Sequence, residues 1–324
     1  MGSAIRHEPW CARRASVLGG VAMKTLNGVA VIWTLAVVFV QPAAAALQVF
    51  ACEPEWATLT EELGGTAVSV TSATTGLQDP HRIQARPSLI AKVRRADLIV
   101  CTGADLEVGW LPMLLRQAGN ARVLPGQAGY FQAADHVTML DVPTRVDRAA
   151  GDVHPAGNPH IHTDPRRIAD VAAALVKRLA QIDARNSASY EERYADFIAR
   201  WQAAVAGWEE RAAPLRDMAV VSTHQGWVYL YEWLGLREVA TLEPKPGLPA
   251  SAAHLAAVQQ RLQQQPARLI IHAAYQDARP AEWLAERSNL PVVELPFTVG
   301  GNAAATNLFA LFEDTVSRLL AARE

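Results

Sequence analysis

The amino-acid sequence predicts an α/β fold of two lobes, each a parallel sheet flanked by helices, joined by one long rigid helix. Short apolar segments alternate with helical patterns in the first and last thirds of the chain. Such alternation favours parallel strands covered by helices on both faces. Residues 165–216 differ, because they contain almost no Gly and much Ala, Arg, Glu and Leu, which indicates helices alone.

The elements of the first lobe follow from apolar runs bounded by Gly and Pro. Apolar or alternating segments predict strands, and Gly64 with Gly65 marks the end of the first helix. The expected strands lie within 47–56, 66–74 and 96–103, with a weaker one at 121–126. The expected helices are 57–65, 88–96 and 105–119.

Two helices are expected next, and the second is long. Apolar residues recur at helical spacing from Ile168 to Leu179. Aromatic and aliphatic side chains then form one stripe over 187–215. A helix of roughly 27 residues is about 40 Å long, the width of a domain. We interpret the stripe as core and the helix as the link between the lobes.

The alternation resumes in the second lobe. The expected order is strand, turn and helix over 218–236, then a strand, a helix, a strand and a closing amphipathic helix, at 267–274, 280–290, 291–298 and 306–323. We therefore divide the chain into residues 1–46, an N-terminal lobe 47–180, a linking helix 181–216 and a C-terminal lobe 217–324. Two such lobes leave a cleft between them, and ligands bind at the carboxyl ends of parallel strands.

The N-terminal segment is typical of an export signal. Lys24 precedes an apolar stretch, residues 29–40, and Ala43–Ala45 supply the small residues of a cleavage site. The stretch is shorter than the about 20 residues that span a bilayer. We interpret residues 1–22 as an upstream extension from a start codon placed too early, and predict a mature chain that begins near Ala46 or Leu47 in the periplasm.

Two cysteines, Cys52 and Cys101, remain in the predicted mature chain. We reject lipidation of Cys52, because Phe50 fits a lipobox poorly and the apolar stretch ends too early. Two cysteines cannot scaffold a domain, so a hydrophobic core must hold the fold. An oxidising compartment permits one bridge between them, and two buried free thiols are the equal alternative.

Histidines cluster at predicted loops. Residues 151–165 read GDVHPAGNPHIHTDP and contain His154, His160 and His162. His81 follows the second predicted strand, and His224 directly follows a strand of the second lobe. Three histidine-bearing loops that meet at one cleft suit Zn²⁺, which prefers nitrogen and takes four ligands. A calcium or magnesium site would instead require carboxylates.

These segments resemble the zinc-uptake solute-binding proteins of ABC transporters, a metal-binding class with two lobes and a linking helix. The resemblance covers essentially the whole mature chain and is carried by DPHRIQARPS, ADLIVCTGADLEVGWLP, GNPHIHTDP, VVSTHQGWVYLYEWLGL and LPFTVGG. It implies that His81, His160 and His224 bind the metal. It also implies that Zn²⁺ is the transported ligand, because manganese-binding relatives replace one of the three histidines with a carboxylate.

The sequence departs from the family pattern at two positions. His162 stands where the family usually has an aromatic or aliphatic residue. Four interpretations are open: a residue that contacts the metal ligands, a ligand on the uptake path, an alternative to His160, or an ordinary loop residue. Leu295 precedes Pro296 where many relatives have Asp, so the fourth ligand is open. The candidates are Glu243, Asp277, Glu294, Asn307 and a water molecule.

The remaining histidines receive other interpretations. We expect His154 to be peripheral and His272, within or just after a strand, to be a core histidine. We expect His136 and His254 to lie on the surface.

The function that follows is capture of Zn²⁺ in the periplasm and delivery to a membrane permease with its ATPase; the chain is not an enzyme. A zinc metallochaperone is kept as an optional further partner, and the protein is expected to be a monomer. The net charge of −2 and the scattered Lys and Arg argue against nucleic acid as a partner.

Two alternative functions remain. One is a zinc-dependent periplasmic hydrolase with an open three-histidine site, which would use Asp164 beside the H-x-H pair. The other is a surface adhesin or metal buffer. We interpret Asp164 and Pro165 instead as the cap and first turn of the next helix.

Overall fold

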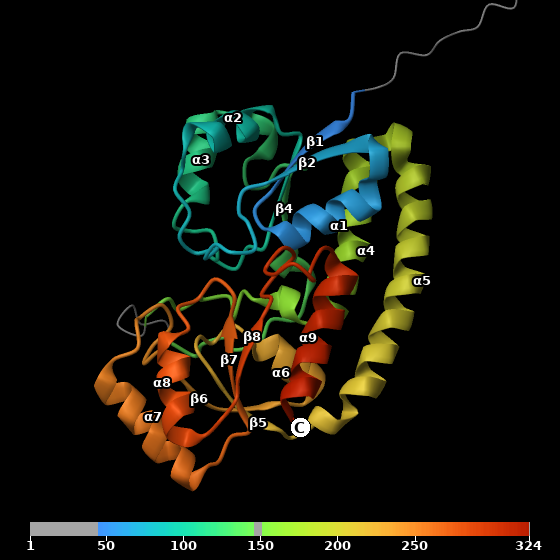
Figure 1. The fold of residues 1–324 in the computed structure, drawn as a ribbon. Coiled ribbons are helices and arrows are strands. Elements are labelled where there is room, and N and C mark those ends of the chain that lie inside the picture. Colours follow the sequence, from blue (N-terminus) through green and yellow to red (C-terminus); the bar gives the residue numbers. More distant parts are fainter. Residues whose placement is uncertain (1–44, 146–150, 324) are drawn as a thin grey trace, which may run out of the picture. The chain divides into compact units, whose positions relative to one another are not determined.

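Two four-stranded parallel sheets form the framework of the protein (Figure 1). The computed structural model describes residues 45–145 and 151–323, which belong to one compact unit. The predicted signal peptide lies almost entirely outside these residues. The two-lobed α/β fold predicted from the sequence is confirmed.

The first sheet has the strand order β2-β1-β3-β4. Its elements are β1 (Leu47–Ala51), α1 (Pro54–Gly64), β2 (Val68–Ser72), α2 (Pro87–Arg95), β3 (Leu98–Cys101), α3 (Leu111–Ala118) and β4 (Tyr130–Gln132). All neighbouring strands pair in parallel, with Val49 between Val70 and Leu98. The loops that follow β2 and β3 therefore leave the sheet at the same edge.

The second sheet repeats this arrangement, with the strand order β6-β5-β7-β8. Its elements are β5 (Ala219–Ser222), α6 (Val228–Leu234), β6 (Arg237–Thr241), α7 (Ala252–Gln264), β7 (Leu269–Ala273), α8 (Arg279–Ser288), β8 (Val292–Leu295) and α9 (Leu308–Arg323). A bulge between Val220 and Val221 shifts the register of β5 against β6. His224 follows β5 at the carboxyl edge of this sheet.

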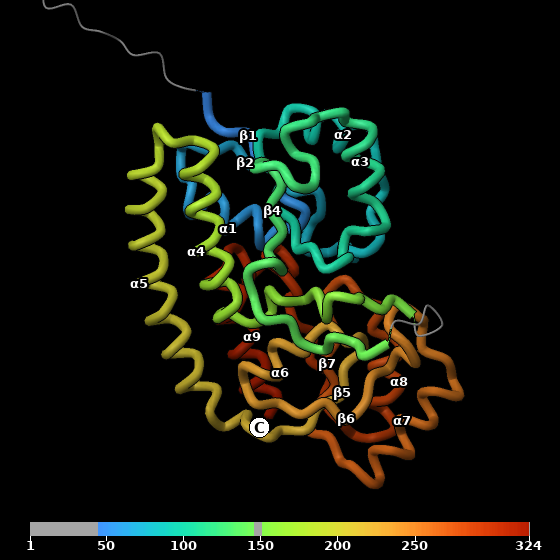
Figure 2. The backbone as a smooth tube through the Cα atoms, turned by 180° about the vertical axis from the view of Figure 1, so that it is seen from behind, coloured from blue at the N-terminus to red at the C-terminus, as the bar shows by residue number. Residues whose placement is uncertain are grey.

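The helices α4 (Pro165–Ile182) and α5 (Ser187–Ala212) connect the sheets. Helix α5 has 26 residues, close to the length predicted, and runs beside both lobes (Figures 1 and 2). It packs on α1 at one end and on α9 at the other. Trp201 and Trp208 are buried against Phe309 and Phe312, so the aromatic stripe is core, as expected.

One hydrophobic core runs through both lobes, and each lobe has a further core on the other face of its sheet. The lobes also approach each other closely at Gly76, in the loop after β2. A Cβ at this position would collide with the backbone of Gly300 and Gly301 in the second lobe. The glycine allows two loops from different lobes to lie in backbone contact.

Several sequence-based element boundaries were wrong. The weak strand expected at 121–126 is a 3₁₀ turn, Ala121–Val123, and the fourth strand lies at Tyr130–Gln132. The helix expected from Asp105 begins only at Leu111, because Ala104 and Asp105 adopt positive φ angles. Strand β6 and helix α7 had no prediction. The cap of α4 is confirmed, since Asp164 Oδ1 accepts the backbone N–H of Arg166 at 2.8 Å.

Candidate metal centre

His81 lies in the long loop between β2 and α2, on the first lobe. Its Nδ1 and its backbone N–H both contact Asp79 Oδ1, at 2.9 and 3.0 Å. Trp110 Nε1 donates to the carbonyl of Pro80 at 2.9 Å and thereby fixes the loop. Burial alone would raise the pKa of Asp79, but the hydrogen bonds and charge of His81 outweigh burial and lower it. An ionised Asp79 keeps the His81 proton on Nδ1 and leaves Nε2 as an electron-pair donor.

His224 is held in the same way on the second lobe. Its Nδ1 lies 2.7 Å from Glu243 Oε2, and the same oxygen accepts the backbone N–H of Gly247 at 2.9 Å. Glu243 follows β6, a strand that neighbours β5 in the sheet. Its carboxylate therefore reaches His224 from the adjacent strand end and directs Nε2 away from Glu243.

His160 stands between the two, directly before the 3₁₀ turn Ile161–Thr163, and is 1% exposed. Its backbone N–H donates to Asn158 Oδ1 at 3.0 Å, while Asn158 Nδ2 donates to the carbonyl of Gln225 at 2.7 Å. Asn158 thus ties the His160 loop to the residue after His224. Burial first, and the neighbouring histidines second, hold the pKa of His160 well below its usual value, so its ring is neutral.

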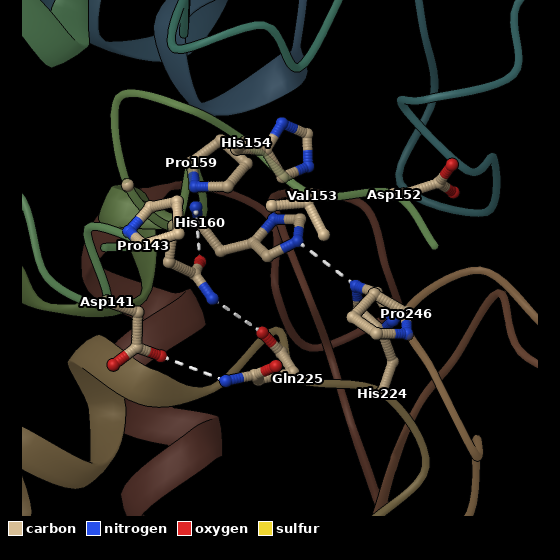
Figure 3. Close-up of a pocket in the computed structure, with 12 residues that line it drawn as sticks. Asp141, Pro143, Asp152, Val153, His154, Pro159, His160, His224, Gln225 and Pro246 are labelled. Carbon is tan, nitrogen blue, oxygen red and sulfur yellow. Dashed lines mark hydrogen bonds between the residues drawn. The ribbon is translucent and has the colours of Figure 1, made fainter. Parts of the chain in front are cut away.

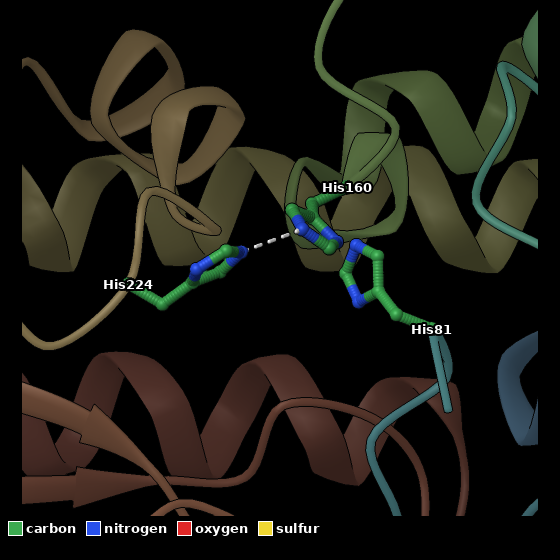
Figure 4. A group of neighbouring side chains, drawn as sticks. All are labelled: His81, His160 and His224. Carbon is green, nitrogen blue, oxygen red and sulfur yellow. Dashed lines mark hydrogen bonds between the residues drawn. The ribbon is translucent and has the colours of Figure 1, made fainter. Parts of the chain in front are cut away.

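The three histidines converge from separate segments of the chain (Figure 4). Each offers one donor nitrogen, and the three nitrogens lie within 4.8 Å of one another. The Nε2 atoms of His160 and His224 are 3.3 Å apart. His81 Nε2 is buried and has no hydrogen-bond partner within the described segments. The arrangement can supply three neutral nitrogen ligands to one cation, two of them oriented by carboxylates.

His162 does not join this group. It is 2% exposed, and its Nε2 donates to the carbonyl of Phe297 at 3.1 Å. Its Nδ1 lies 3.3 Å from Glu55 Oε1. His162 is thus buried beside His160, with 6.3 Å between their ring centroids, and its Nε2 is bonded to the protein.

His154 lies closer to the site than the sequence suggested. Its ring centroid is 5.4 Å from that of His81, and its Nδ1 contacts the carbonyl of Ala104 at 3.1 Å. Burial, followed by the charge of His81, lowers the pKa of His154 to about 4. A cavity of about 220 Å³ is lined by His154, His160 and His224 (Figure 3). His154 thus lies beside the three converging histidines and outside their group, and its role stays a prediction.

The other histidines take structural roles. His272 is buried, and its Nδ1 contacts the carbonyl of Ala273, so its assignment to the core is confirmed. His136 is exposed and stacks on Phe131. His254 is half-buried rather than fully at the surface, since its Nε2 donates to the carbonyl of Thr241.

A disulfide joins Cys52 and Cys101, with 4.8 Å between their Cα atoms, so the bridge and not the pair of free thiols is present. Next to it, Glu53 and Glu107 are buried together around Thr102. Burial raises the pKa of Glu107 to about 7, and burial together with the negative charge of Glu107 raises the pKa of Glu53 well above its usual value. The sequence analysis did not single out this carboxyl pair, because nothing in its spacing distinguishes it from surface acids.

None of the helices in the described part of the chain combines the length and apolar character that a bilayer crossing requires. Solved structures with the same fold include a crystal structure of ZnuA, which superposes with a TM-score of 0.71 at 20% identity over 86% of this chain and all of the other. A manganese-bound periplasmic metal-binding protein from Candidatus Liberibacter asiaticus also superposes with a TM-score of 0.71, at 17% identity, again over 86% of this chain and all of the other.

Two proteins of Streptococcus pneumoniae serotype 4 are similar in sequence. The zinc-binding lipoprotein AdcA is 24% identical over 208 residues, which are 61% of this chain but 39% of AdcA. The manganese ABC transporter substrate-binding lipoprotein PsaA is 20% identical over 254 residues, which are 78% of this chain and 80% of PsaA. This chain thus spans well under half the length of AdcA.

A family model provides the broadest match. The model described as "Zinc-uptake complex component A periplasmic" (ZnuA) aligns with residues 49–322, which include both lobes and all three converging histidines. The resemblance read from the sequence motifs is thereby confirmed. The protein belongs to the family of the periplasmic zinc-uptake complex component A.

Proposed function

We propose that the protein binds Zn²⁺ through His81, His160 and His224 in the periplasm and delivers it to the permease of an ABC transporter that is driven by its ATPase. The observation that carries the proposal is the convergence of three donor nitrogens within 4.8 Å, from both lobes and from the segment between them. Burial lowers the pKa of His160, which favours the neutral ring, and the neutral ring is the form that binds a metal.

The geometry favours zinc. Zinc is bound tetrahedrally by nitrogen at about 2.0–2.1 Å, so two of its ligand atoms are about 3.3 Å apart. The two facing Nε2 atoms of His160 and His224 are separated by 3.3 Å. Manganese prefers carboxylate and carbonyl oxygens. The nearest carboxylates, Asp79 and Glu243, are already hydrogen-bonded to ligand imidazoles.

The relatives support a transport role and differ in their metal. AdcA is named a zinc-binding lipoprotein and PsaA a manganese ABC transporter substrate-binding lipoprotein. The all-nitrogen donor set supports zinc as the metal in our proposal. Cys52 is joined to Cys101 in a disulfide, so its thiol is not available for a lipid anchor.

No contact in the described residues favours the hydrolase that the sequence analysis kept as an alternative. Such a hydrolase would use Asp164. This side chain is buried, caps α4 and pairs with Arg166 at 2.8 Å, so it cannot serve as a general base. The second histidine of the H-x-H pair, His162, is bonded to the carbonyl of Phe297.

The test is a competition titration of the exported chain, from Leu47 onward, with Zn²⁺ and Mn²⁺ against a chromophoric chelator. We expect one tightly bound Zn²⁺ per chain, weaker Mn²⁺ binding, and loss of most zinc affinity in His81→Ala, His160→Ala and His224→Ala. His136→Ala removes an exposed histidine and serves as the matched control. Equal zinc affinity in His224→Ala and His136→Ala would refute the site. Vesicles that contain the permease and ATPase would then test delivery by zinc uptake.

A further inference from the structure

The proposed site leaves the fourth position of a tetrahedral Zn²⁺ open. Leu295, which stands where many relatives have Asp, is fully buried in the core. The polar candidates from the sequence are engaged elsewhere or lie on the surface. Glu243 is bonded to His224 and Gly247, Asp277 to Arg279, and Asn307 to the N–H of Ala310, while Glu294 is exposed on β8.

His154 has a donor atom that is not engaged in this way. Its Nδ1 faces the carbonyl of Ala104, and because a carbonyl can only accept, this nitrogen carries the proton. Nε2 of the neutral ring therefore keeps its lone pair. Among His81, His224 and His154 the pattern is the same: Nδ1 donates to an oxygen of the protein and Nε2 is left for a cation.

The position of His154 also fits. Ring centroids among the three converging histidines are 5.2, 5.4 and 5.9 Å apart, and the centroids of His154 and His81 are 5.4 Å apart. Four imidazoles around one zinc ion have ring centres roughly 5 Å apart, given zinc–nitrogen bonds of about 2.0–2.1 Å. His154 therefore already has the spacing of a fellow ligand with respect to His81.

A cavity of about 220 Å³ is lined by His154, His160 and His224, whose side chains Figure 3 shows. Its two acids are less suited to bind the ion. Asp141 accepts a hydrogen bond from Gln225 at 3.0 Å, and Asp152 lies 4.0 Å from Arg82. The imidazole of His154 is thus the donor that can close on an ion by crossing this cavity.

We propose that His154 Nε2 is the fourth zinc ligand, so that the bound ion has four imidazole nitrogens. This inference rests on the proposed zinc-binding function. His154 stands outside the group of three whose nitrogens lie within 4.8 Å, so the ring moves toward His160 and His224 when the ion binds. A site of four neutral nitrogens discriminates against ions that require oxygen ligands.

X-ray absorption at the zinc edge counts imidazole ligands in the zinc-loaded exported chain. Four imidazoles in the wild type and three in His154→Ala are expected. Three in the wild type, with an oxygen ligand in addition, would overturn the inference, as would four in His154→Ala.

The same variants report on affinity. Competition titration should show zinc affinity lowered at least about 10-fold in His154→Ala, since even the loss of a partner behind a ligand costs 10- to 100-fold. His136→Ala should match the wild type, and thermal melts should show that both variants are folded. Unchanged affinity in His154→Ala would refute the fourth ligand and leave the function intact. If the proposed function were wrong, the titration would instead show no tightly bound zinc in the wild type.

Discussion

Glu55 Oε1 lies 3.3 Å from His162 Nδ1, and both side chains are almost completely excluded from water, at 1% and 2% exposure. Glu55 belongs to α1 of the first lobe, and it also accepts the hydroxyl hydrogen of Thr298 in the second. His162 Nε2 donates to the carbonyl of Phe297. The pair thus joins the two lobes through the loop that carries His160.

We expect His162→Phe, which introduces a residue type common in the family, to lower the free energy of unfolding by about 1–3 kcal/mol. The change leaves the buried Phe297 carbonyl without its hydrogen-bond donor and removes the contact with Glu55. Urea unfolding at neutral pH measures the effect. Glu55→Gln combined with His162→Phe should cost less than the sum of the two single changes. Additive costs would show that the two side chains are not coupled.

The carboxylates behind the ligands give a second prediction. Glu243→Ala and Asp79→Ala should each weaken zinc binding about 10- to 100-fold, because the imidazoles lose the partners that fix their tautomer and orientation. Competition titration measures the zinc Kd. Glu294→Ala is the matched control, since that carboxylate is exposed on β8. A Glu243→Ala variant with the affinity of the control would argue against this role.

The disulfide gives a third prediction. Cys52→Ala/Cys101→Ala should lower the free energy of unfolding by about 2–4 kcal/mol, because the bridge closes a long loop that the reduced chain leaves open. The two residues are 49 positions apart in the sequence. Urea unfolding with and without a phosphine reductant measures the difference. The reductant should shift the wild-type midpoint and leave that of the variant in place.

The buried carboxyl pair gives a fourth prediction. The pKa values of Glu53 and Glu107 are raised in the folded protein, that of Glu107 to about 7, so the folded state holds more protons than the unfolded chain between about pH 4.5 and 7. The stability that the pair contributes is therefore complete at low pH and is lost as the pH rises through this window.

Glu53→Gln keeps the shape of the protonated carboxyl and cannot ionise. We expect it to raise the free energy of unfolding at pH 8 by about 1 kcal/mol and to have little effect at pH 4.5. Glu294→Gln, on the exposed face of β8, is the control for a change of net charge. An identical pH dependence in the wild type and Glu53→Gln would contradict the shared burial of the two acids.

Much of the fold could be predicted because hydrophobic patterns report burial directly. The buried run of β3 and the stripe of α5 are both recognisable along the chain. The missed elements have weaker patterns. Strand β6 is only partly buried. The start of α3 depends on positive φ angles at Ala104 and Asp105, and these two residue types do not predict such angles from the sequence.

The candidate site, like the fold, could be predicted only in part from the sequence. Family motifs single out His81, His160 and His224, and the structure brings them together, although their role in binding metal stays a proposal. Asp79 is two residues from His81, so its contact is local. Glu243 reaches His224 only because β6 lies beside β5, and the sequence analysis named it as one of several candidates for the fourth ligand. His154 was expected to be peripheral, and its proximity to His81 and Ala104 depends on contacts between loops that are distant in the sequence.

The three histidines lie far apart in the sequence and meet only when the chain folds. They come from the loop after β2, the turn before α4 and the loop after β5. An ion bound by all three is a removable cross-link between the lobes. Its binding free energy adds to that of folding, by about 4 kcal/mol when free zinc exceeds the Kd a thousandfold. Loaded and unloaded forms would then differ in how readily a protease cuts them, and release to a partner returns the protein to the more easily digested form.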